Sequence, residues 1–97
     1  MSAVLPMTDY VVRQSSPSLA DLRKGQSARI VSVTAAGDVP NDIIRRLSDL
    51  GFLPGEFVRV LARGPVGGEP IAVRVGAATF GLRRQEAQCI RVDLQGE

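Results

Sequence analysis

The side chains that carry most protein chemistry are scarce in this chain. It has no His, which removes the commonest general base and the commonest metal ligand. Its single cysteine, Cys89, cannot build a cysteine-rich metal site or an intramolecular disulfide. A serine or threonine nucleophile would need a base, and only Lys24 and scattered carboxylates are available. We therefore expect no catalytic residues, no metal and no cofactor, and we expect that the protein is not an enzyme.

Three weaker signals have simpler interpretations than chemistry. Asp38 and Asp42 are close in sequence, but loop and helix-capping roles suit them better than a catalytic pair. The stretch Gly64–Gly68 lacks the Gly-Lys-Ser/Thr ending of a phosphate loop and is typical of a hairpin connection. Cys89 falls in a predicted strand, and we interpret it as a small buried hydrophobe.

Arginine pairs occur at Arg45-Arg46 and Arg83-Arg84, but the chain has 12 basic and 10 acidic residues, with no clustered basic stretch. A scattered, solvated surface is the favoured interpretation. Binding of single-stranded nucleic acid usually needs aromatic rings in a basic groove, and one Tyr and three Phe are too few. We expect no nucleic-acid partner, and a small-barrel nucleic-acid-binding module stays as the alternative.

The element that organises the chain is a predicted helix over 41–50. Asn41 suits its N-cap, and Gly51 suits the left-handed residue that ends it, with Phe52 reaching back to Leu47. The apolar residues of this helix recur at a spacing that predicts one buried face; they are Ile43, Ile44, Leu47 and Leu50.

Short strands dominate the rest. Strand propensity is highest at 26–35, with an irregularity near Val31, and at 57–61, 71–75, 80–82 and 89–94, where Ile90, Val92 and Leu94 point inward. Single helical turns are expected after a capping box at 18–21 and again at 83–87, and a type II turn at 53–56. We expect a mainly β fold, a small antiparallel barrel of about five strands with one inserted amphipathic helix, because closure removes exposed sheet edges.

The length of 97 residues fits one domain, with 1–17 as an N-terminal extension and 18–97 as the barrel. Nothing in the chain has the pattern of a signal peptide or the ~20 apolar residues of a membrane span. We therefore expect a cytoplasmic protein without direct membrane insertion. A weak homo-oligomer is left open.

The order and spacing of several motifs resemble the FeoA family over about residues 19–94. The resemblance implies an SH3-like barrel with an inserted helix, in agreement with the element count. The motifs are Leu19-x-x-Leu22-x-x-Gly25, Ala28-x-Ile30, Arg46-Leu47-x-Asp49-Leu50-Gly51-Phe52-x-Pro54-Gly55 and Phe80-Gly81-Leu82-Arg83-x-x-Glu86-Ala87-x-x-Ile90-x-Val92.

The resemblance also implies a non-enzymatic accessory role in bacterial ferrous iron uptake. The implied partner is FeoB, a membrane transporter with a cytoplasmic GTP-binding domain, and the effect on it could be on nucleotide hydrolysis, gating or assembly. The same barrel occurs in iron-dependent repressors of the diphtheria toxin repressor type, so a transcription regulator-like module belongs to the alternative.

Partner contact must use what the fold leaves exposed, and we expect the helix and its exit to supply it. Leu53 and Phe57 are apolar residues that one small barrel does not obviously bury, and charged residues flank them. The competing interpretation is that both pack under the loop. The predicted partner-binding residues are Arg45, Arg46, Asp49, Phe52, Leu53 and Phe57.

Overall fold

The protein is a curled β-sheet with one long helix at its side. The computed structural model describes residues 17–37 and 39–94, so the predicted N-terminal extension, apart from Pro17, lies outside the described residues. In this part of the chain, the mainly β fold class with a single longer helix is confirmed. In chain order the elements are η1 (Leu19–Asp21, a 3-10 helix), β1 (Ser27–Val33), α2 (Asn41–Leu50), β2 (Phe57–Gly64), β3 (Gly68–Val75), β4 (Ala78–Leu82), α3 (Arg84–Ala87) and β5 (Ile90–Asp93).

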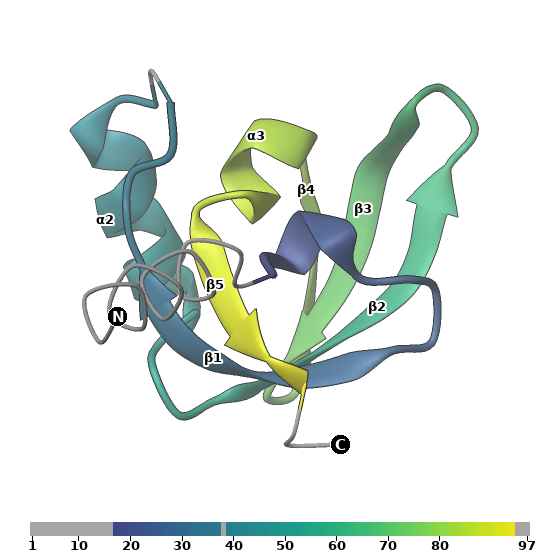
Figure 1. Cartoon of the computed structure of the whole chain (residues 1–97), viewed down its shortest axis with the longest axis horizontal. Coiled ribbons are helices and arrows are strands. Elements are labelled where there is room, and N and C mark those ends of the chain that lie inside the picture. Colours follow the sequence, from purple (N-terminus) through teal and green to yellow (C-terminus); the bar gives the residue numbers. More distant parts are fainter. Residues whose placement is uncertain (1–16, 38, 95–97) are drawn as a thin grey trace, which may run out of the picture.

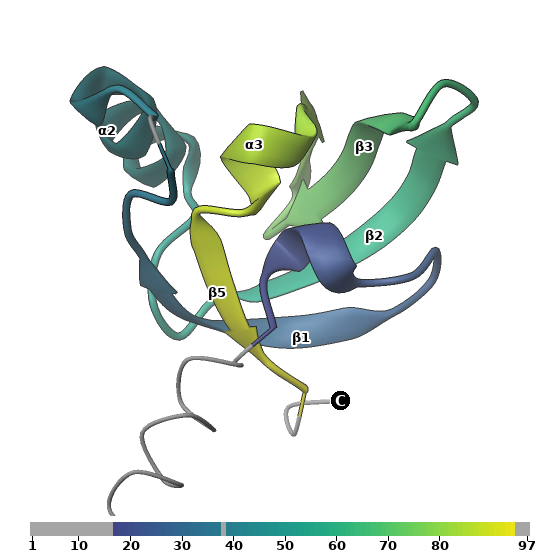
Figure 2. The same cartoon turned by 45° about the horizontal axis from the view of Figure 1, so that its top comes forward.

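The five strands form one antiparallel sheet in the order β4-β3-β2-β1-β5. Figures 1 and 2 show the sheet curling, with α2 and α3 next to each other on its open side. Alternate residues of each strand point into an aliphatic core, as the strand period predicts. The buried strand residues are Ala28, Ile30, Val58, Val60, Ile71, Val73, Val75, Leu82, Ile90 and Val92.

The two edges of this sheet differ. At the β5 edge, Arg91 bridges to Ser18 and the Val92 N–H donates to the Pro17 carbonyl at 3.1 Å. Pro17, the last residue of the predicted N-terminal extension, thus contacts the edge of the sheet. In the described part of the chain, β4 pairs only with β3. The expectation that closure removes exposed edges therefore holds at one edge and fails at the other.

Several local predictions are confirmed. The Ser18 N–H donates to Asp21 Oδ2 at 2.9 Å, which closes the capping box before η1. A register shift between Ile30 and Ser32 places a bulge at Val31. Gly55 has φ +94, and the Glu56 N–H donates to the Leu53 carbonyl at 3.0 Å, as the predicted turn requires.

Two local predictions are wrong. The N-cap of α2 is Pro40 rather than Asn41, because Pro40 has the extended backbone of an N-cap and its carbonyl accepts from the Ile43 N–H at 3.1 Å. Asn41 is the first helical residue. Leu94 is 39% exposed rather than inward, because the sheet pairing ends at Asp93, opposite Arg29.

Candidate functional site

Helix α2 ends in a left-handed turn that leads into the core, whereas most of its inward face is only half-buried. Gly51 has φ +112, and the Phe52 N–H donates to the Leu47 carbonyl at 3.0 Å, so the predicted left-handed ending is confirmed. Of the four predicted inward residues, only Leu47 is fully buried. Three are half-buried and pack against the rim of the core: Ile43, Ile44 and Leu50.

Phe52 belongs to the core, which corrects its assignment as a partner-binding residue. Its side chain has 0% exposure, and its ring lies 5.8 Å from that of Phe80, tilted by 53°. The backbone bond to Leu47 turns the residue inward, and the ring fills the space between the end of α2 and strand β4. Phe52 can therefore position the site but cannot contact a partner on its surface.

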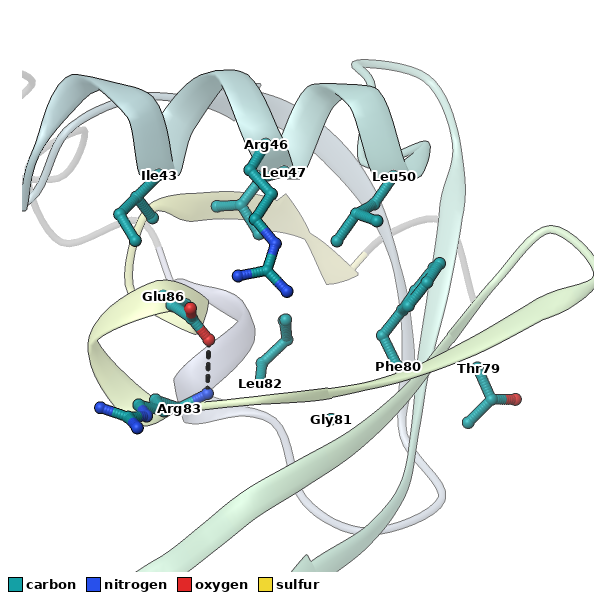
Figure 3. A pocket seen from close by; sticks show the side chains of 10 residues that line it. All are labelled: Ile43, Arg46, Leu47, Leu50, Thr79, Phe80, Gly81, Leu82, Arg83 and Glu86. Carbon is teal, nitrogen blue, oxygen red and sulfur yellow. Dashed lines mark hydrogen bonds between the residues drawn. The ribbon is translucent and has the colours of Figure 1, made fainter.

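A groove of about 540 Å³ lies between α2 and the β4–α3 segment. Figure 3 shows side chains from both walls pointing into it. Its floor is apolar and its rim carries the charges of Arg46, Arg83 and Glu86. The other lining residues are Ile43, Leu47, Leu50, Thr79, Phe80, Gly81 and Leu82.

The charges of the groove are unevenly engaged. The backbone N–H of Arg83 donates to Glu86 Oε1 at 2.8 Å, which engages the Glu86 carboxylate and caps the short helix α3 (Figure 3). Within residues 17–37 and 39–94, no group forms a hydrogen bond or an ion pair with the Arg46 guanidinium. In Figure 3 this guanidinium points from α2 into the groove. The Arg83 guanidinium likewise has no such partner among the described residues, but in Figure 3 it points away from Arg46, so Arg46 is the cation that faces the groove.

A second surface, the exit patch, consists of Arg29, Val31, Leu53 and Phe57. Leu53 is 45% and Phe57 47% exposed, so they do not pack under the loop. Val31, at the β1 bulge, is 55% exposed. Val31 follows Ile30, which is hydrogen-bonded to the turn after Leu53. The Ile30 carbonyl accepts from the Gly55 N–H, and the Ile30 N–H donates to the Glu56 carbonyl, each at 2.8 Å.

Arg29 lies over the Phe57 ring, with its guanidinium carbon 4.8 Å from the ring centroid. Arg29 and Phe57 are opposite each other in the β1–β2 register, so both extend from the outer face of the sheet. Sequence reasoning missed Arg29 and Val31. The bulge predicted near Val31 was a usable signal for the second, since a bulge changes the direction of a side chain.

The remaining predicted residues do not join one site. Arg45 and Asp49 are on the exposed face of α2, and only Arg46 of the predicted charges lines the groove. Cys89 is buried, as expected, and its thiol donates to the Gln85 carbonyl at 3.4 Å. The described residues hold no group of three His, Cys, Asp or Glu side chains suited to a metal ion.

Comparison with known proteins shows to which family the chain belongs. A family model described as the FeoA domain matches residues 18–94. The chain belongs to the FeoA family. The resemblance seen in the sequence is thereby confirmed, and members of this family are non-enzymatic factors of iron transport rather than enzymes. The chain has no significant match among curated proteins.

Solved FeoA structures share the fold over most of the chain. FeoA from Stenotrophomonas maltophilia, solved with zinc and described as an SH3 domain protein, is 45% identical and covers 80% of this chain and 91% of its own, with a TM-score of 0.72. FeoA from Chlorobium tepidum is 37% identical and covers 80% of this chain and 70% of its own, with a TM-score of 0.68. The predicted SH3-like barrel is confirmed.

The same domain occurs within a larger regulator. A manganese-dependent transcriptional repressor is 27% identical over 80% of this chain, which corresponds to 41% of the repressor, with a TM-score of 0.67. The FeoA chain thus matches less than half of that protein. In the part of the FeoA chain that the structure describes, no helix is long and apolar enough to cross a membrane.

Proposed function

We propose that this FeoA protein is a cytoplasmic accessory factor of ferrous iron uptake that binds and modulates the FeoB-type membrane transporter. The match of the FeoA model to residues 18–94 carries this proposal. The 45%-identical relative from S. maltophilia, for which a role as a ferrous iron transport activating factor has been suggested, supports it. A protein that acts by contact needs no catalytic constellation, in keeping with a chain that has no His.

The exit patch supports the location of this contact. Exposed apolar side chains flanked by charge are typical of protein-binding surfaces. The Arg29 guanidinium above the Phe57 ring favours one position of the ring, which lowers the side-chain freedom lost on binding. Arg45 and Asp49, on the exposed face of α2 and outside the exit patch, remain predicted partner contacts.

The first experiment is a titration of the protein into the purified GTP-binding domain and, separately, into the full transporter. Binding and the rate of GTP hydrolysis are followed together. Binding with a changed rate would make the protein a regulator of the nucleotide cycle. Binding to the full transporter alone, at an unchanged rate, would indicate gating or assembly. No binding to either would contradict the proposal.

The exit patch is tested as the binding surface for the transporter with the variants Leu53→Arg and Phe57→Glu. Each places a charge in the centre of a contact that should exclude water, so we expect binding to the transporter to weaken by about tenfold or more. Val66→Glu is the matched control, because Val66 is 80% exposed on the β2–β3 connection and is not in the exit patch. Equal binding by all three variants, each folded by circular dichroism, would remove the exit patch from the proposal.

A further inference from the structure

We propose that the groove between α2 and β4 binds an extended segment of the transporter, which pairs with the outer edge of β4 and sets a carboxylate against Arg46. This inference rests on the proposed function, because the transporter is the partner. It adds to the exit patch a second contact with the transporter, in which hydrogen bonds to the backbone of the partner contribute to recognition. Three features of the groove support it.

The first feature is the backbone of β4. Strands β3 and β4 are joined by the two residues Gly76-Ala77, with Gly76 at φ +59 and Val75 opposite Ala78. In a two-residue hairpin the closing pair exchanges hydrogen bonds, and bonded and non-bonded pairs then alternate along the strands. Thr79 and Gly81 consequently direct their N–H and C=O groups away from β3. No other backbone partner for these two residues is found in the described chain.

The second feature is the contrast between the two sheet edges. The β5 edge is covered by Pro17 and Ser18, whereas the β4 edge opens on the groove, which Thr79 and Gly81 line. An unpaired edge is a template for another strand unless the fold blocks it with charge, Pro or a covering segment. Residues 78–82 carry no charge and no Pro. The β4 edge is thus suited to strand addition.

The third feature is what a strand added there would meet. Every second side chain of the added strand would face the half-buried apolar residues of the groove, among them Ile43, Leu50 and Phe80. Strand addition of this kind gains affinity from the backbone and specificity from pockets for alternate side chains. A segment with apolar residues at every second position fits the groove.

The charges on the rim of the groove favour a segment that carries an acidic residue. The rim carries two arginines, Arg46 and Arg83, and one carboxylate, Glu86, of which one oxygen already accepts from the backbone N–H of Arg83. Arg46 has no partner among the described residues, so a carboxylate on the segment would gain a charge-assisted contact. A basic residue at that place would be disfavoured, and the segment we infer is therefore apolar and acidic.

The test uses overlapping peptides that span the cytoplasmic segments of the transporter, titrated into the 15N-labelled full-length protein. We expect one acidic, apolar peptide to shift the amides of Thr79 and Gly81 and to slow their hydrogen exchange. Shifts confined to the exit patch would overturn the inference. Slow exchange of both amides in the free protein would show that the chain covers its own edge, and would also overturn it. Shifts that depend on protein concentration alone would assign the groove to a second copy instead.

Two variants, each with a control, then test the full transporter. Thr79→Pro removes an outward N–H without removing a bond to β3, and should weaken binding about tenfold, whereas Thr79→Ala keeps the N–H and should bind as the native protein does. Arg46→Glu should weaken binding by about tenfold or more. Arg84→Glu makes the same charge change outside the groove lining and should change binding less than about twofold.

The outcomes separate this inference from the proposed function. Native protein that binds the transporter while Thr79→Pro and Arg46→Glu, both folded, bind equally well would overturn the groove and leave the proposed function standing. Native protein that does not bind the transporter would overturn both.

Discussion

The exit patch and the groove both depend on α2 and the residues after it, but their apolar side chains are exposed for different reasons. In the exit patch, each exposed apolar residue is next to a buried one: Leu53 follows Phe52, and Phe57 precedes Val58. Strand and turn geometry alone sends such neighbours to opposite sides. In the groove, Ile43 and Leu50 are on the inward face of α2 and stay half-buried because the helix stands off from β4.

Because of this difference, the exit patch and the groove would contact a partner in different ways. The exit patch is built from single side chains on rigid strands and a turn, so its contact depends on a few apolar groups. The groove is a space between two elements, so its contact depends on how α2 is held. Gly51 and Phe52 end α2 and join it to the core beside Phe80, so a change at either residue should alter the groove.

The largest expected effect is that of Phe52→Ala. Removing a fully buried ring that packs on Phe80 should lower the free energy of unfolding by about 3–5 kcal/mol, measured by urea denaturation. Phe57→Ala is the matched control, because Phe57 is 47% exposed and should cost less than about 1 kcal/mol. Similar losses for the two variants would contradict the distinction between a core ring and a surface ring.

A smaller effect is expected from Gly51→Ala. An added Cβ would meet nothing within 4 Å, so the cost comes from the left-handed backbone at φ +112 and should be about 1–2 kcal/mol of unfolding free energy. Gly51→Asn should cost less, because Asn tolerates this conformation better. An alanine variant as stable as the native protein would show that the end of α2 can adjust, and that the groove is not fixed by this turn.

The smallest effect is expected from Arg29→Gln, which removes the cation above the Phe57 ring. The contact is at the surface, so the loss in unfolding free energy should be about 0.5–1 kcal/mol. Arg59→Gln is the control, since Arg59 is exposed on β2 and no ring contact of it is found in the described residues. A larger loss for Arg59→Gln than for Arg29→Gln would remove the argument that Arg29 holds the ring in place.

Local signals in the sequence predicted much of the fold. The capping box at Ser18, the left-handed end of α2 at Gly51 and the bulge at Val31 each depend on a few neighbouring residues, and all three are confirmed. The N-cap at Asn41 failed because the preceding Pro40 has the capping backbone without a capping side chain. The sequence predicts that Phe52 reaches back to Leu47, but its assignment to the partner-binding surface is wrong, because the ring is buried against Phe80, which is distant in the sequence.

The sequence by itself determined the strands, the helix and its ending, because period, turn chemistry and propensity are properties of adjacent residues. It also determined that Leu53 and Phe57 were candidates for exposure. Tertiary structure decided the rest, because the features of the groove depend on contacts between segments that are distant in the sequence. These features are the separation of α2 from β4, the position of Arg46 over the groove, and the edge of β4 at Thr79 and Gly81, which pairs with no further strand in the described residues. Hydrophobic burial is non-directional, so the pattern of α2 fixed which face points inward but not how closely it packs.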